Sequence, residues 1–234
     1  MLVSRIIADP RRLRRFVRFV SPSAEAVALD VWLGPAVLAR VLAPRVSRLV
    51  AVQREDPPRN WRRPRNVELV RVAGLAPELP FPDETFDLVT CGRPFHHFPR
   101  PREVLSEMWR VCRPGGWLAL EETVAHEQEV RARYQDRLER LRDRSHPRYF
   151  RLSELLHLLG EAGFLVRRLQ VVDLQREFNE WLLGARPSPQ KVELMRRLMT
   201  GGQEADLSGL DIRAVGDTFV FTQRLAWLVA ERIA

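Results

Sequence analysis

Short apolar segments alternate with helical patterns along the first half of the chain, and this alternation constrains the fold more than any other feature. The segments are five or six residues long and lie at 26–31, 48–53, 67–72, 86–91 and 117–121. Strands that alternate with helices at this spacing form a mostly parallel sheet with helices on both faces. The sequence therefore predicts an α/β protein with a doubly wound sheet.

The segment 10–20 has the pattern of an amphipathic helix. Its apolar residues recur at helical spacing, and arginines occupy the other faces, at positions 11, 12, 14, 15 and 18. The simpler interpretation is a solvated basic face. The alternative is a basic helix placed over a site that takes an acidic ligand.

Composition limits the class of protein. The chain has 234 residues, 45% of them hydrophobic, which is enough for a sizeable core in one α/β domain with a small lid. No apolar run is long enough to span a bilayer, and no secretory signal is seen. Cys91 and Cys112 are the only thiols and suggest neither a disulfide framework nor a metal site. We expect a cytoplasmic protein without membrane insertion.

The formal net charge is +8, and Lys191 is the only lysine. A basic surface permits nucleic-acid or anion binding. The arginines are scattered along the chain rather than gathered in one block, which favours a coding bias or a hot habitat over a nucleic-acid site.

Three motifs resemble those of the class I S-adenosylmethionine-dependent methyltransferases. They are LPFPDETFDLV at 79–89, FHHFPRP at 95–101 and EMWRVCRPGG at 107–116, in the family's order and spacing. The nearest subgroup is the small-molecule type that includes the ubiquinone and menaquinone methyltransferases. Ser145-His146 and the segments 161–164 and 180–182 extend the likeness toward the C-terminus.

The resemblance implies a Rossmann-like, seven-stranded sheet with the last strand antiparallel. It also implies a domain organisation: an N-terminal helix at 1–23, a core at 24–175 and 214–234, and a helical lid inserted at 176–213. S-adenosylmethionine is the cofactor that the family implies, and no metal is expected.

The predicted cofactor loop departs from the family pattern. The family has approximately D-x-G-x-G-x-G after the first strand, where glycines let the backbone approach the cofactor. Asp30 and Gly34 match this pattern, whereas Trp32 and Ala36 stand on glycine positions. The Trp32 indole either fills the space that the cofactor needs or is tucked back into the core.

Two further cofactor positions lack the expected acid. Gln53 ends the second strand, where the family has an acid for the ribose hydroxyls. Leu75, before Ala76, replaces an acid that pairs with the adenine. Cys91 also belongs to the predicted cofactor rim. Each lost charge-assisted hydrogen bond costs about 1.5–3 kcal/mol, so we predict weak or absent binding of S-adenosylmethionine.

His96 and His97 follow the fourth strand at its carboxyl end, where open α/β sheets place their chemistry. His97 is the better candidate for a general base, and the alternative is a histidine that fastens the loop by hydrogen bonds. Arg93 on the same rim would hold an acidic substrate or is an ordinary surface arginine. A nucleophilic pair of Cys91 and His97 is the weaker possibility.

The resemblance implies that His146, at the hinge of the lid, and Trp181 of the lid face the substrate pocket.

These residues leave three hypotheses for function. The first is a small-molecule methyltransferase with weakened cofactor binding. The second is a non-catalytic methyltransferase-like protein that serves a protein partner or another ligand. The third, motivated only by the positive charge, is an RNA-binding or RNA-modifying protein.

Overall fold

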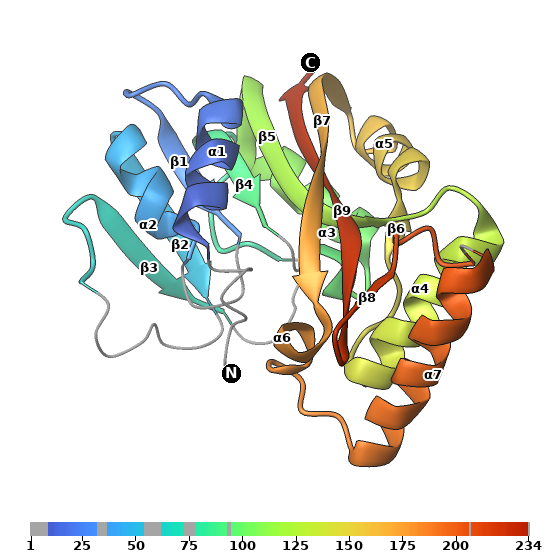
Figure 1. Cartoon of the computed structure of the whole chain (residues 1–234). Coiled ribbons are helices and arrows are strands. Elements are labelled where there is room, and N and C mark those ends of the chain that lie inside the picture. Colours follow the sequence, from blue (N-terminus) through green and yellow to red (C-terminus); the bar gives the residue numbers. More distant parts are fainter. Residues whose placement is uncertain are drawn as a thin grey trace. The chain divides into compact units, whose positions relative to one another are not determined.

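The structure is a computed structural model that describes residues 9–31, 37–53, 62–72, 78–92, 95–205 and 207–233 (Figure 1). The helices are α1 (Pro10–Val20), α2 (Ala39–Leu42), α3 (Pro101–Val111), α4 (Glu129–Arg142), α5 (Leu152–Glu161), α6 (Phe178–Leu182) and α7 (Pro189–Ala205). Two short 3₁₀ turns are η1 (Ala43–Arg45) and η2 (Phe95–His97). The strands are β1 (Val27–Asp30), β2 (Arg48–Gln53), β3 (Val67–Arg71), β4 (Phe86–Cys91), β5 (Cys112–Ala125), β6 (Phe150–Arg151), β7 (Phe164–Glu177), β8 (Arg213–Val215) and β9 (Thr218–Arg232).

The strands form one sheet whose main path is β3-β2-β1-β4-β5-β9-β7, with β6 paired to β5 and β8 paired to β9. The pairs β1–β2, β2–β3, β1–β4 and β4–β5 are all parallel. The predicted α/β fold with a mostly parallel sheet is therefore confirmed, and seven strands make up its main path.

Strand β5 is longer than the segment predicted from sequence. The sequence predicted a strand at 117–121, whereas β5 begins at Cys112 and contains residues 113–116 as an irregularity. Phe86 of β4 aligns with Cys112, and Leu88 aligns with Trp117. A Cβ on Gly116 would lie 2.8 Å from the Arg113 carbonyl oxygen, so only glycine fits this fold of the backbone.

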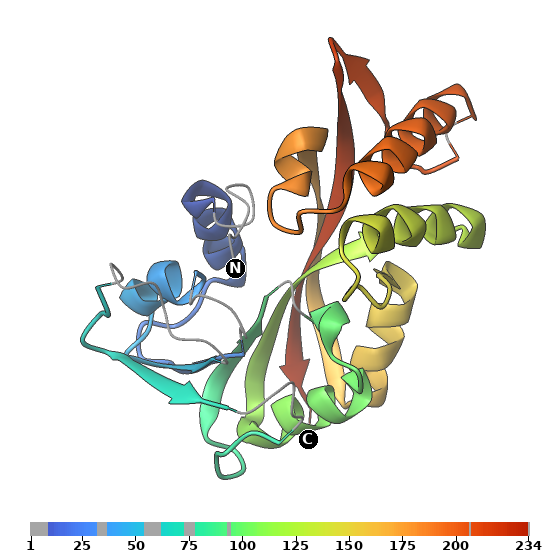
Figure 2. The same ribbon diagram turned by 90° about the horizontal axis from the view of Figure 1, so that it is seen from below.

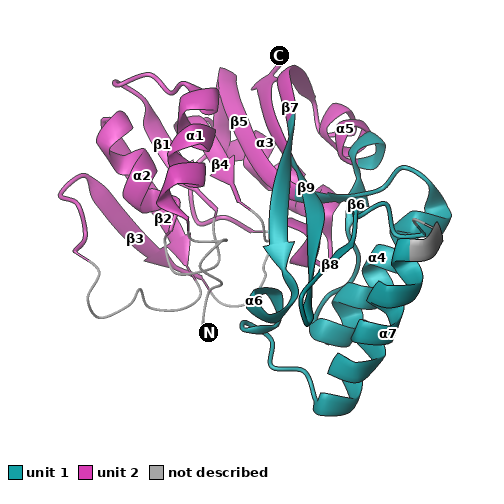
Figure 3. Cartoon of the chain, in the orientation of Figure 1, with its two compact units in different colours: residues 1–8, 123–154, 171–225 teal, residues 9–122, 155–170, 226–234 magenta. Residues whose placement is uncertain are grey.

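The chain divides into two compact units (Figure 3). Unit 2 comprises residues 9–122, 155–170 and 226–234, and unit 1 comprises residues 1–8, 123–154 and 171–225. The predicted lid at 176–213 contributes α6 and α7 to unit 1, which also contains α4. The boundaries of the predicted N-terminal helix, core and lid stay a prediction.

Unit 2 holds the parallel strands β1 to β4 around an apolar core, in which Ala28, Leu29, Leu49 and Val89 have no exposed area. The apolar face of α1 is buried in the same unit, as its spacing predicts. Arg12 is an exception to the predicted solvated basic face of this helix. It is buried and forms an ion pair with Glu121 of β5.

Unit 1 has a core of its own. In both views of the ribbon α4 and α7 lie side by side (Figures 1 and 2). The core contains Leu138 of α4, Phe178 and Trp181 of α6, and Met195 and Met199 of α7. Among the described residues, no helix combines the length and the apolar character needed to span a membrane.

Candidate functional site

The order of the strands marks a switch point in unit 2. Going outward from β1, one side of the sheet continues to β2 and β3, and the other side continues to β4 and β5. In open α/β sheets, ligands bind beyond the carboxyl ends of the strands at this reversal. Asp30 ends β1 and Cys91 ends β4, so the fold brings these two predicted site residues to the switch point.

Asp30 is fully buried at this point. Its Oδ1 accepts a hydrogen bond from Thr90 Oγ1 at 2.9 Å, and its Oδ2 has no hydrogen-bond partner in the described part of the chain. Burial raises the pKa of the Asp30 carboxyl to about 7, although the Thr90 hydrogen bond acts in the opposite direction. The site therefore carries a carboxyl group that changes its charge near neutral pH.

Gln53 lies at the end of β2, beside Arg71 at the end of β3. Its side chain is buried, and the Nε2 donor has no partner among the residues that the structure describes. A buried amide hydrogen without an acceptor costs free energy unless a ligand or water supplies that acceptor. Gln53 thus offers an open hydrogen-bond donor where the sequence predicted a cofactor residue.

The two histidines lie on η2 and are tied to β5. Glu122 accepts hydrogen bonds from the His96 backbone nitrogen at 3.0 Å and lies 2.8 Å from His96 Nδ1. His97 is half-buried, and its ring centroid lies 4.2 Å from that of His96. Glu122 holds His96 in place, and His97 is the more accessible of the two rings.

Sequence reasoning missed Glu122. The signal was present, because Glu121 and Glu122 continue the apolar strand segment that begins at Trp117. Two adjacent carboxylates within a buried strand need partners in the interior. One of them meets a histidine, and the other meets an arginine and a tryptophan.

Cys91 is a buried thiol beside two carboxyl groups. Burial raises its pKa well above the ordinary value, and the charges of Glu122 and Asp30 act in the same direction. A nucleophilic cysteine needs the thiolate form. The surroundings of Cys91 therefore disfavour the nucleophilic pair with His97.

We expect neither cysteine to react with Ellman's reagent in the folded protein at pH 8. Cys112 is also buried, and burial raises its pKa to about 12. The small thiolate fraction should slow both reactions by at least about 100-fold relative to a free thiol. The Cys91→Ser and Cys112→Ser variants assign any reaction to one residue. Rapid reaction of Cys91 would contradict this environment, and denaturant should release two thiols.

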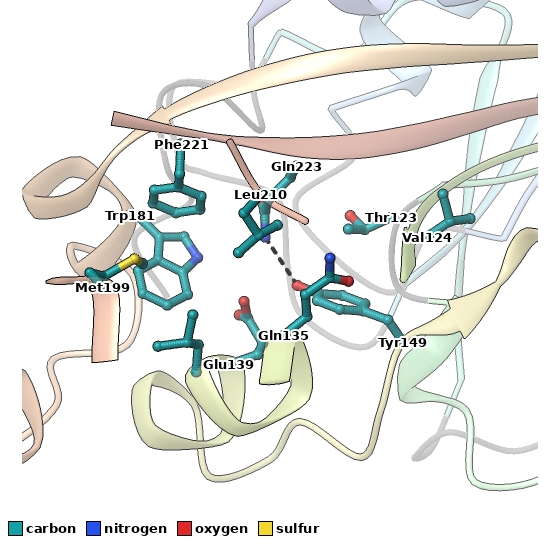
Figure 4. Close-up of a pocket in the computed structure, with 11 residues that line it drawn as sticks. Thr123, Val124, Gln135, Glu139, Tyr149, Trp181, Met199, Leu210, Phe221 and Gln223 are labelled. Carbon is teal, nitrogen blue, oxygen red and sulfur yellow. Dashed lines mark hydrogen bonds between the residues drawn. The ribbon is translucent and has the colours of Figure 1, made fainter. Parts of the chain in front are cut away.

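The predicted lid residues both lie in unit 1. His146 is buried, with Nε2 at 3.0 Å from Asp136 Oδ1 and its ring against Tyr149. Trp181 lines a small cavity of about 20 Å³, which suits about one water molecule. Figure 4 shows this cavity with the Trp181 indole nitrogen directed toward Glu139 and Gln135, and no described group accepts its hydrogen.

The remaining predicted residues lie outside the described residues. They are Trp32, Gly34 and Ala36 of the first loop, Leu75 and Ala76 after β3, and Arg93 after β4. Within the described ranges, no group of three or more potential metal-ligating side chains is found.

Several known proteins that are similar to this chain are described as methyltransferases. A family model described as a methyltransferase domain matches residues 29–120, which lie in unit 2. The uncharacterized methyltransferase YcgJ of Bacillus subtilis is 28% identical over 207 residues, covering 86% of this chain and 82% of that protein. A demethylmenaquinone methyltransferase of Listeria welshimeri is 52% identical over 58 residues, which are 25% of this chain and 24% of that protein.

A solved structure agrees over nearly the whole chain. It is that of the protein BH2331 from Bacillus halodurans C-125, assigned provisionally to the methyltransferases. The TM-score is 0.83 at 27% sequence identity, and the match covers 95% of this chain and 99% of that one.

Proposed function

This chain belongs to the class I S-adenosylmethionine-dependent methyltransferase family, and from that premise we propose that it methylates a small molecule while binding S-adenosylmethionine weakly. The observation that carries the weakened binding is Gln53, a neutral and buried amide at the end of β2. The small-molecule class rests on the motif resemblance and on the relative named for demethylmenaquinone, which matches a quarter of the chain.

The residues at the switch point fit a nucleoside. Gln53 Nε2 is a buried donor and Asp30 Oδ2 a buried oxygen, and neither has a partner in the described part of the chain. A ribose hydroxyl both donates and accepts, so it would satisfy groups of either kind. When bound, S-adenosylmethionine supplies a sulfonium methyl group for transfer to a nucleophile. Asp30 and Gln53 would hold its nucleoside part.

The histidines of η2, which follows the carboxyl end of β4, would supply the general base. His97 would accept a proton from the substrate, because its ring is the more accessible of the two. His96 would fix the orientation of His97 through the contact between their rings, and Glu122 fixes His96. Positioning of this kind contributes to catalysis by keeping the reacting groups aligned.

The expected affinity follows from the missing charges. A hydrogen bond to a carboxylate is worth about 1.5–3 kcal/mol, and the amide of Gln53 and the aliphatic Leu75 replace two such groups. Together they would weaken binding by roughly two to four powers of ten. Relative to a micromolar site, the dissociation constant would lie near 1 mM in order of magnitude.

Calorimetric titration of the full chain with S-adenosylmethionine tests this proposal. We expect the Gln53→Glu variant, which restores the charge on a side chain of the same length, to bind about 10 to 150 times more tightly. Gln175→Glu adds the same charge on exposed residue 175 of β7 and should leave the affinity unchanged. A low-micromolar constant for the unmodified chain would refute the weakened site.

The alternative function is a non-catalytic scaffold for a partner or another ligand. The loss of two acids and two loop glycines from one predicted site favours it. If the scaffold has lost the cofactor altogether, neither the unmodified chain nor Gln53→Glu would give a binding signal. If the unmodified chain gives a binding signal and Gln53→Glu binds more tightly, the methyltransferase proposal is supported.

A further inference from the structure

We propose that β7 pairs edge to edge with β7 of a second copy of this chain, in antiparallel orientation, and so forms a homodimer. The strand runs without interruption from Phe164 to Glu177. It ends the main path of the sheet, and among the described strands its one neighbour is β9. An edge strand of this length presents a row of backbone donors and acceptors that can pair with another chain.

The face of β7 that carries its odd-numbered residues is exposed along the strand. All odd-numbered residues from 165 to 175 are exposed, and they include three apolar side chains. Leu165, Leu169 and Val171 are 42%, 43% and 44% exposed. Natural edge strands are usually short or covered when they carry apolar side chains. The length and the exposed apolar residues of β7 therefore favour a partner.

The charges of β7 identify the partner as a second copy. In an antiparallel pair centred on Gln170, residues equally distant from Gln170 face each other. Arg167 then faces Asp173 of the second copy, and Leu169 faces Val171 of the second copy. Because the arrangement is two-fold symmetric, each contact occurs twice. The strand is thus complementary to itself in both charge and apolar character.

Both charged groups remain accessible for this contact. Arg167 Nε lies 2.7 Å from Glu231 Oε2, yet half of its side chain is exposed. Asp173 is 71% exposed, and its contact with Arg224 is long, at 3.9 Å. Asp173 of the second copy would extend the pair of Arg167 and Glu231 into a row of three charges.

Sedimentation equilibrium of the full chain tests the dimer. The expected result is a concentration-dependent shift from the 27.2 kDa monomer toward twice that mass. Arg167→Glu and Asp173→Arg should each raise the dissociation constant at least about tenfold, because each places like charges opposite one another. The double variant exchanges the charges and should restore the dimer. Glu231→Gln removes the neighbour of Arg167 within the chain and should change the constant by less than about threefold.

A disulfide scan tests the register. Opposed residues of an antiparallel pair have Cα atoms about 4.5–5.5 Å apart, which a disulfide spans. Gln170→Cys should therefore cross-link two copies on oxidation. Gln175→Cys, which faces Leu165 of the second copy, should not. The native cysteines are buried and do not compete.

A monomer at all concentrations up to about 200 μM would overturn the proposal. If neither Arg167→Glu nor Asp173→Arg weakens the dimer, the proposal is also overturned, because the contact then lies on another surface. Cross-linking of Gln175→Cys as fast as that of Gln170→Cys would overturn the register.

Discussion

Replacing Glu121 with alanine should lower the free energy of unfolding by about 3–5 kcal/mol. Glu121 is 1% exposed and stabilises two buried groups of unit 2. One carboxylate oxygen accepts a hydrogen bond from Arg12 of α1, and the other accepts from Trp227 Nε1 of β9 at 2.8 Å. The substitution removes the buried carboxylate that neutralises the charge of Arg12. A buried charge that loses its counter-charge costs far more than an exposed one.

Urea unfolding followed by tryptophan fluorescence measures this effect. Glu103→Ala is the matched control, because it removes an acid that pairs with Arg100 on the exposed surface of the same unit. We expect the control to change the free energy of unfolding by less than about 1 kcal/mol. Glu121→Gln keeps one oxygen that accepts a hydrogen bond from one of the two donors. Its change in the free energy of unfolding should therefore lie between those of the two alanine variants. Equal effects of Glu121→Ala and Glu103→Ala would contradict the buried pair.

The strands of unit 2 could be predicted from sequence because each is marked locally. The predicted bounds of β2 and β4 agree with the structure to the residue, since a buried parallel strand is a short apolar run bounded by polar or turn-forming residues. The start of β5 was wrong for the opposite reason. A proline and two glycines normally end a strand, and here the pairing of β4 with β5 tolerates them as an irregularity.

The partners of buried charges could not be predicted, because they depend on long-range pairing. Arg12 looked like one arginine of a solvated helix face, and its partner Glu121 is far away along the chain. His96 was identified as a site residue from its motif, whereas its contact with Glu122 requires β5 to pass beside η2. Spacing along the sequence places a residue on an element, but only the register between elements selects its neighbour.

The candidate site likewise combines features that the sequence predicts with features that it does not predict. Asp30, Gln53 and Cys91 were placed correctly at the ends of their strands. Their protonation and their unmatched hydrogen-bonding groups follow from burial, which the sequence does not measure. For Asp30 this environment has a large consequence for stability.

The stability of the protein should fall by roughly 4 kcal/mol between pH 4 and pH 8 on account of Asp30 alone. Burial raises the pKa of this carboxyl from 3.8 to about 7 in the folded state. Between these two values the folded protein holds a proton that the unfolded chain has released. The free energy of unfolding therefore decreases as the pH rises through this window, and it levels off above the folded pKa.

The Asp30→Asn variant isolates this contribution, because asparagine is neutral at every pH and keeps an oxygen that accepts from Thr90. We expect the two proteins to be about equally stable at pH 4 and the variant to be more stable by several kcal/mol at pH 8. The acids with lowered pKa values, among them Glu107 and Glu139, lose stabilisation as the pH falls below their ordinary pKa of 4.5, at the acidic end of this window, and this loss is common to both proteins. Groups other than residue 30 are common to both proteins, so their contributions cancel in the difference. Thr90→Val removes the hydrogen bond that lowers the pKa of Asp30, so the decline should then extend to higher pH. A difference between wild type and Asp30→Asn that stays constant from pH 4 to pH 8 would show that this carboxyl does not titrate in the window.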